Sequence, residues 1–139
     1  MKKLTIADVE YIAHSLAKEL MTFNEPIPDF STRFPGVLER CLMSPYQTFG
    51  GKYLYRGLLG KASILFYVMV KDHPFQNGNK RLAVTSLLTL LDFNNKWLYV
   101  DTQILYNFTV WIASSPSDAS NQVVKAVEEF LKKYVKDLK

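Results

Sequence analysis

The amino-acid sequence predicts an all-α protein, a bundle of about six helices with one small β-hairpin, in a single domain spanning residues 1–139. Two stretches, 58–71 and 79–93, are so apolar that each must be a helix packed on all sides. Two such helices cannot face water, so the other helices have to surround them. A pair of glycines between two aromatic-rich arms, at 48–55, predicts the hairpin.

The N-terminal part is predicted to hold two amphipathic helices. Thr5 and Asp8 have the spacing of a capping box, and apolar residues then recur at helical spacing to about residue 21. His14 lies one residue away from this apolar stripe, so we expect it at the surface or at the rim of the core. Residues 23–34 contain two prolines and are expected to form a loop, after which Pro35 begins a short helix that ends before the next proline.

The C-terminal part is predicted to hold the last two helices. Asp101 begins the first of them, which ends at residues 114–116, Ser-Ser-Pro. Ser117 and Asp118 are expected to cap the last helix, whose apolar stripe runs as far as Leu138. Several lysines lie near the end of this helix, where the dipole favours positive charge, and we expect them to form a solvated face.

Composition argues against several classes of function. The net charge of +4 is too mild to indicate a nucleic-acid-binding protein, and no zinc-finger or RNA-recognition signature is present, so nucleic acid is not expected as a partner. No apolar run reaches the roughly 18–20 residues of a membrane span, and no apolar leader follows Met1. The single cysteine, Cys41, lies among apolar residues, so we expect a buried structural thiol in a reducing, cytoplasmic setting.

The polar loop between the two apolar helices, residues 73–81, contains the side chains best suited to chemistry. His73 can take a proton from a hydroxyl near neutral pH. Gly78 lets backbone N–H groups approach a ligand closely, because it has no Cβ. If the next helix starts near Asn79, its free N–H groups attract an anion such as phosphate, and the basic pair 80–81 adds full charges. A base beside a polyphosphate cradle is typical of phosphoryl or nucleotidyl transfer.

This loop resembles the signature of the Fic/Doc (Fido) superfamily, in which a histidine, a phenylalanine and a Gly-Asn-x-Arg segment stand at the same spacing. Lys80, between Asn79 and Arg81, makes it most similar to the Doc, or death-on-curing, branch. The similarity extends to an upstream Thr-Phe-Gly-Gly segment and covers at least residues 35–95. It implies a Fic/Doc-type helical bundle in which a β-hairpin flap precedes the central helix and holds the target segment.

The resemblance implies a role for each matching position. His73 would be the general base that deprotonates a target hydroxyl, and Lys80 and Arg81 would be catalytic with it. Gly78, Asn79, Lys80 and Arg81 would bind the phosphates of the nucleotide. The residues of the target-binding flap would be Phe49, Gly50, Gly51, Lys52, Tyr53 and Leu54.

Two further positions in the loop have implied roles. Phe75 would pack inward and hold the loop. Asn77 occupies the position that in most Fic enzymes is an acidic ligand of Mg²⁺, and it would be the metal-binding residue here. A neutral amide oxygen is a poorer ligand for a hard dication than a carboxylate, so we expect weak metal affinity, or Mg²⁺ held chiefly by the phosphates of ATP.

Three functions are compatible with these residues. The resemblance implies a Doc-like toxin of a toxin–antitoxin pair, which transfers the terminal phosphate of ATP to a Ser or Thr hydroxyl of a target protein, with elongation factor Tu as the target. The alternatives are Fic-type transfer of AMP to a protein hydroxyl and a catalytically inactive module that binds a peptide.

The resemblance also implies a means of restraint. Fic proteins are restrained by a helix with the pattern Ser/Thr-x-x-x-Glu-Gly/Asn, whose glutamate pairs with the arginine of the signature. The one pair with this spacing, Ser15 and Glu19, is followed by Leu20 and lies within the first predicted helix. We interpret this match as chance, so a separate antitoxin protein is the expected partner.

Overall fold

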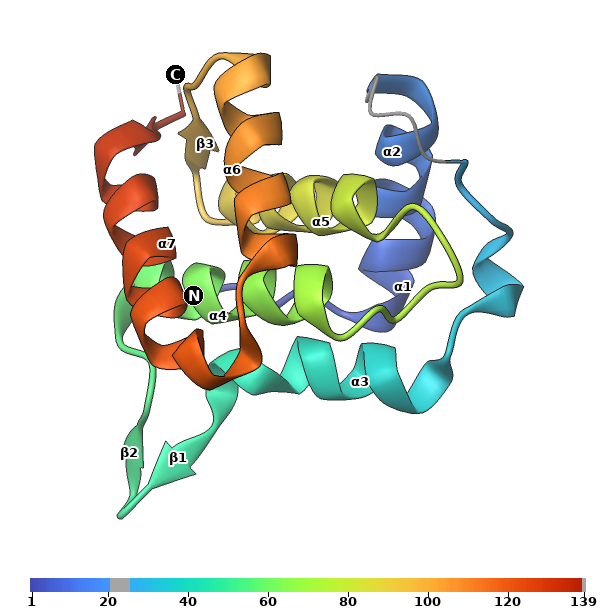
Figure 1. The fold of residues 1–139 in the computed structure, drawn as a ribbon. Helices are drawn as coiled ribbons and strands as arrows, with labels where there is room; N and C mark the ends of the chain where they lie inside the picture. Colours follow the sequence, from blue (N-terminus) through green and yellow to red (C-terminus); the bar gives the residue numbers. More distant parts are fainter. Residues whose placement is uncertain (21–25, 139) are drawn as a thin grey trace.

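The computed structural model describes residues 1–20 and 26–138, and these residues form six helices, as the sequence predicts (Figure 1). The first helix consists of α1 (Ile6–Asp8), a π-helical turn (Val9–Ala13) and α2 (His14–Leu20). The others are α3 (Pro35–Met43), α4 (Gly57–Lys71), α5 (Asn79–Phe93), α6 (Thr102–Ser114) and α7 (Ser120–Tyr134). Short 3₁₀ turns lie at Phe30–Thr32, Ser44–Tyr46 and Ser117–Ala119.

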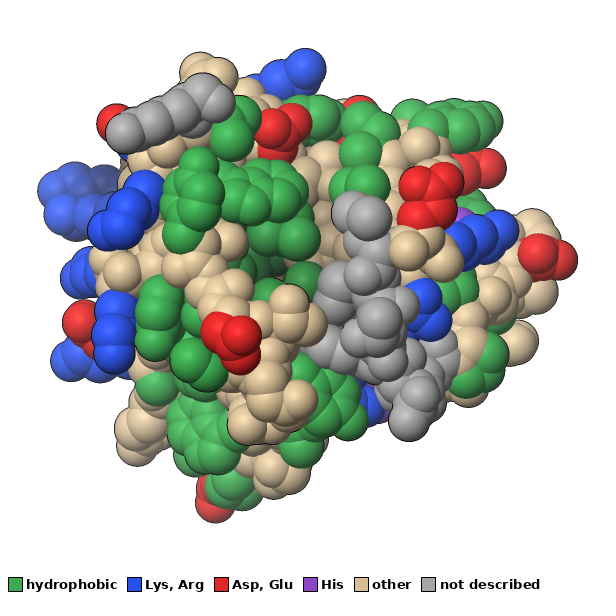
Figure 2. Space-filling view, turned by 90° about the horizontal axis from the view of Figure 1, so that it is seen from above, with side chains coloured by type: hydrophobic (Ala, Val, Ile, Leu, Met, Phe, Trp, Pro, Cys, Tyr) green, Lys and Arg blue, Asp and Glu red, His purple; other side chains and the backbone are tan. Residues whose placement is uncertain are grey.

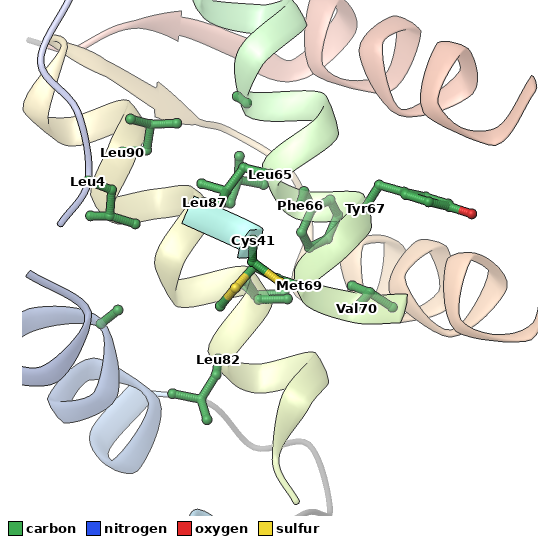
Figure 3. Packing of buried hydrophobic residues seen from close by; sticks show 14 of the residues in the cluster. Leu4, Cys41, Leu65, Phe66, Tyr67, Met69, Val70, Leu82, Leu87 and Leu90 are labelled. Atoms are coloured by element: carbon green, nitrogen blue, oxygen red, sulfur yellow. The ribbon is translucent and has the colours of Figure 1, made fainter. Parts of the chain in front are cut away.

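Helices α4 and α5 form the centre of the bundle and pack against each other. Every residue of α4 from Gly60 to Val70 is buried except Val68, which confirms the predicted all-round packing. Helices α3, α6 and α7 surround α4, and the first helix covers α5. Figure 3 shows side chains of this core, in which Leu65 and Met69 of α4 and Leu87 of α5 belong to one buried cluster. The described residues contain no helix long and apolar enough to cross a membrane.

The start of the first helix agrees with its predicted capping box. Asp8 donates its backbone N–H to Oγ1 of Thr5 at 3.2 Å, and Thr5 donates its own N–H to Oδ2 of Asp8 at 2.9 Å. Both bonds satisfy backbone groups that the helix itself leaves unpaired. The loop predicted at 23–34 is confirmed for residues 26–34, apart from the turn at Phe30–Thr32; residues 23–25 lie outside the described part.

The predicted hairpin is also present, and it projects from the bundle ahead of α4 (Figure 1). Strand β1 (Thr48–Phe49) pairs antiparallel with β2 (Lys52–Tyr53). Between the strands, Gly50 and Gly51 have φ angles of 60° and 78°, so the turn needs two residues that tolerate a left-handed backbone. The two glycines therefore explain why the chain reverses at this point.

The predicted C-terminal helix is wrong at both ends. Ser117 and Asp118 belong to a 3₁₀ turn and do not cap α7, which begins after Ala119 without a side-chain cap. The helix ends at Tyr134, so Leu138 lies beyond it and is 41% exposed.

A second two-stranded sheet explains the early end of α7. Residues Val135–Asp137 form strand β4, which pairs antiparallel with β3 (Lys96–Leu98) and was not predicted. Each strand has three residues, too few to show an alternating pattern, and the partner is distant in the sequence. An ion pair between Lys96 and Asp137 joins the strands and lowers the pKa of the Asp137 carboxyl.

The lysines of α7 form a solvated face, as expected. Lys132 and Lys133 of α7 are exposed, and so is Lys136, which lies in strand β4 beyond the end of the helix. Lys and Arg side chains gather at the left edge of Figure 2, the side on which Figure 1 places α7. Lys139 lies outside the described residues.

The single cysteine gives a test of the predicted core. Cys41 is 1% exposed, and burial raises the pKa of its thiol to about 12. Because the thiolate is the reactive form, we expect Cys41 to react with a thiol reagent such as DTNB only when the chain unfolds. Absorbance kinetics with and without denaturant would check this, and labelling of the folded protein at the rate of a free thiol would contradict it.

Candidate active site at the α4–α5 loop

His73 lies in the loop between α4 and α5 with an unusual backbone. Its φ angle is 51°, in the left-handed region, which costs a residue with a Cβ on the order of 1–3 kcal/mol. The side chain is exposed, so the core does not require it there. A strained backbone at an exposed polar residue is a feature that clusters at functional sites.

Asn79, the first residue of α5, holds the loop in this shape. Its buried side chain accepts the N–H of Phe75 at Oδ1, 3.0 Å away, and donates from Nδ2 to the carbonyl oxygen of Phe75 at 2.9 Å. The same Nδ2 lies 3.3 Å from Nδ1 of His73. Since Nδ2 can only donate, Nδ1 is the acceptor, and the neutral ring carries its proton on Nε2. The side chain of Asn79 thus holds the loop in shape. Its backbone lies at the N-terminus of α5, where the sequence predicts that an anion binds.

Phe75 anchors the loop in the core, as the family resemblance implies. It is 1% exposed, and its ring centroid lies 5.9 Å from that of Phe30 and 6.4 Å from that of His14. His14 meets Phe30 edge to face at 5.7 Å, and its Nε2 lies 2.8 Å from the carbonyl oxygen of Pro28. These contacts join the first helix, residues 28–30 and the candidate active-site loop.

The expectation that His14 lies at the surface or rim is therefore wrong, because it is 5% exposed. The π-helical turn provides the physical reason. The N–H of His14 bonds to the carbonyl oxygen of Val9, five residues earlier, so one residue more than usual is fitted into the turn. This places His14 on the same buried face as Val9, whereas the ordinary helical period puts it one residue away from the apolar stripe.

Position 78 requires a glycine, because the segment of residues 26–34 borders the loop and packs closely against it. The φ angle of Gly78 is 73°, and a Cβ there would lie 2.7 Å from Cδ1 of Ile27 and 2.8 Å from the carbonyl oxygen of Pro26. A further bond, from the N–H of Phe34 to the carbonyl oxygen of Pro74 at 2.9 Å, ties this segment to the loop. Sequence reasoning missed residues 26–34 as part of the site, because nothing local in them signals this contact.

Lys80 and Arg81 lie in the first turn of α5, and both are half-buried. Nη2 of Arg81 donates to the carbonyl oxygen of Ala17 in α2. Two cations at a helix N-terminus add to the positive end of the helix dipole, so this end of α5 favours an anion. The loop and the first turn of α5 therefore hold His73, Gly78, Asn79, Lys80 and Arg81, and the role of these residues as a catalytic and phosphate-binding site stays a prediction.

Asn77 does not form a metal centre with other protein groups. It is exposed, and its Oδ1 accepts the N–H of Gly78 at 2.8 Å. Among the described residues, no group of three or more His, Cys, Asp or Glu side chains could hold a metal ion. The donor set therefore does not fit a Mg²⁺ site built from the protein alone.

The hairpin residues Phe49–Leu54 are not brought to this loop. The hairpin precedes α4 and the loop follows it, and Figure 1 shows them at opposite ends of that helix. The fifteen residues of α4 separate the two by roughly 22 Å at 1.5 Å per residue. The hairpin is nevertheless open to a partner, since Phe49 is 81% exposed. Its role as a target-binding flap stays a prediction.

Comparison with known proteins gives one finding. The model of the Fic/DOC family matches residues 3–91, a range that includes α1 to α4, the hairpin, the candidate active-site loop and all of α5 but its last two residues. No curated protein and no solved structure gives a significant match. The family model covers well over half of the sequence, and the fold agrees with it, so the chain belongs to the Fic/DOC family.

Proposed function

We propose that this chain is a Doc-like transferase, which moves the terminal phosphate of ATP to a Ser or Thr hydroxyl of a target protein. Membership of the Fic/DOC family implies nucleotide-dependent modification of proteins. The observation that supports the proposal most is the loop itself, where the imidazole of His73, oriented by Asn79, stands at the cationic N-terminus of α5.

These residues suggest a sequence of steps for the transfer. The lone pair at Nδ1 of His73 takes the proton of the target hydroxyl, whose oxygen attacks the terminal phosphorus. The 3.3 Å contact with Asn79 is long, so a hydroxyl can replace it at Nδ1. Charge on the phosphates is stabilised by N–H groups of α5, by Lys80 and by Arg81 when its guanidinium turns from α2. ADP is the leaving group, and the imidazolium returns its proton to solvent.

Two other functions compete with phosphate transfer. Lys80 stands in place of the glycine of typical Fic signatures, and this favours Doc-like transfer of phosphate over transfer of AMP. An inactive peptide-binding module is favoured by Asn77, which replaces an acidic metal ligand. Intact-mass measurement of target proteins after incubation with ATP, Mg²⁺ and cell lysate separates the three. A gain of one phosphoryl group supports the proposal, a gain of one adenylyl group supports AMP transfer, and no gain supports the module.

We further propose elongation factor Tu as the target and a separate antitoxin as the means of restraint. Ser15 and Glu19, the chance match to an inhibitory helix, are both exposed on α2. Expression of the chain alone in bacteria is therefore expected to stop growth, and co-expression of the neighbouring gene is expected to restore it. Normal growth with the chain alone, equal to that with an inactive variant, would count against both the toxin and its partner.

The metal preference gives a separate prediction. Asn77→Asp is expected to increase the dependence of transfer on Mg²⁺ and to raise the rate at low Mg²⁺ concentration, because a carboxylate is a better ligand for a hard dication. Initial rates across a Mg²⁺ series, compared with Gln76→Asp as a neighbouring control, would test this. A lower rate for Asn77→Asp at every Mg²⁺ concentration would show that Asn77 serves the loop through its bond to Gly78 instead.

A further inference from the structure

Arg33 lies beside the candidate active site but belongs to no part of the signature. It follows the 3₁₀ turn Phe30–Thr32, in the segment that borders the loop. The next residue, Phe34, donates its N–H to the carbonyl oxygen of Pro74 at 2.9 Å. Pro74 directly follows His73, so the backbone of Arg33 is held next to the proposed base.

The side chain of Arg33 is held in place by an aromatic ring. Its guanidinium carbon lies 4.5 Å from the centroid of the Phe30 ring, and that ring in turn packs against Phe75 of the loop. A guanidinium stacked on a ring keeps its planar fork of donors in one orientation, so little entropy is lost when it binds an anion.

The charge of Arg33 has no counter-ion in the described part of the chain. The side chain is half-buried, and its Nε is fully buried without a hydrogen-bond partner among the described residues. Asp29, the nearest carboxylate in the sequence, is exposed and forms no ion pair with it. A partly buried cation that lacks an anion is costly, and the cost falls when an anionic ligand arrives.

We propose that Arg33 is a further phosphate-binding residue of this site, contacting the phosphate oxygens of the nucleotide bound at the N-terminus of α5. The proposal rests on the proposed function, since it needs a nucleotide at that place. The planar guanidinium matches two phosphate oxygens at once, which a lysine cannot do. Arg33 would therefore supply a third cation, from outside the signature, beside Lys80 and Arg81.

The test compares ATP with adenosine, which has the same base and sugar but no phosphate. Arg33→Met keeps an apolar side chain over Phe30 and removes the charge, and we expect it to weaken ATP binding about 10- to 100-fold by calorimetry. Adenosine binding, followed by NMR titration, should not change. Arg33→Lys keeps the charge but not the fork, so its ATP affinity should fall between the two. Arg40→Met is the matched control, because Arg40 is an exposed arginine on α3.

Two results with the Arg33→Met variant would overturn the proposal. One is an ATP affinity of Arg33→Met equal to that of the wild type and of Arg40→Met. The other is a parallel loss of ATP and adenosine binding, which would show that Arg33 only supports the fold near Phe30. If Arg81→Ala loses ATP binding while Arg33→Met keeps it, the proposed function stands and this inference fails. If the wild-type protein binds no ATP at all, both fail.

Discussion

Replacement of His73 by alanine is expected to lower the rate of transfer by about 10²- to 10⁴-fold, the usual contribution of a general base. The fold should survive, because the side chain is exposed and its one hydrogen-bonding contact among the described residues is with Asn79 at 3.3 Å. The rate is measured as phosphate incorporated into the target from labelled ATP, and folding is checked by thermal melting.

A second variant at this position separates chemistry from backbone shape. His73→Asn removes the base but keeps a residue type that tolerates the left-handed backbone found there, with φ at 51°. Both variants should be equally inactive. Full activity in either of them would exclude His73 as the base, whatever group is transferred.

Replacement of Phe75 by alanine is expected to lower the free energy of unfolding by about 3–5 kcal/mol, as for other buried phenylalanines. The ring is 1% exposed and packs against Phe30 and His14, so its removal leaves a cavity between the loop and the first helix. Urea unfolding followed by circular dichroism measures the change.

Phe49→Ala is the matched control for this variant, since the Phe49 side chain is 81% exposed at the tip of the hairpin. It should change the free energy of unfolding by no more than about 0.5 kcal/mol. Equal stability of the two variants would show that Phe75 does not anchor the loop. A target-binding role of the hairpin would appear separately, as weaker modification by the otherwise stable Phe49→Ala protein.

Local signals predicted most of the helices and the loop between the central pair. The apolar runs that form α4 and α5 can only be stable in the core. The start of α5 at Asn79 follows from Gly78, which precedes it. Gly50 and Gly51 likewise predict their turn without knowledge of the rest of the chain.

The features that sequence reasoning missed depend on contacts between distant segments. Pairing of β3 with β4 joins Leu98 to Val135, and neither short strand has a pattern of its own. His14 enters the core because a π-helical turn changes the helical period, and no local residue pattern marks that turn. The distance between the hairpin and the loop is set by the direction of α4, which a motif match does not specify.

The left-handed backbone of His73 lowers the stability of the loop, and this bears on how the protein balances stability against activity. Glycine at this position would relieve the cost of a left-handed backbone, roughly 1–3 kcal/mol for a residue with a Cβ. This exceeds the roughly 0.5–1 kcal/mol that glycine's greater freedom in the unfolded chain costs, so His73→Gly is expected to be more stable than His73→Ala. Under the proposed function, the wild-type chain therefore accepts a less stable loop in return for an imidazole at that point. A lineage released from selection for transfer would gain by losing the histidine first, long before it lost Phe75 or Gly78.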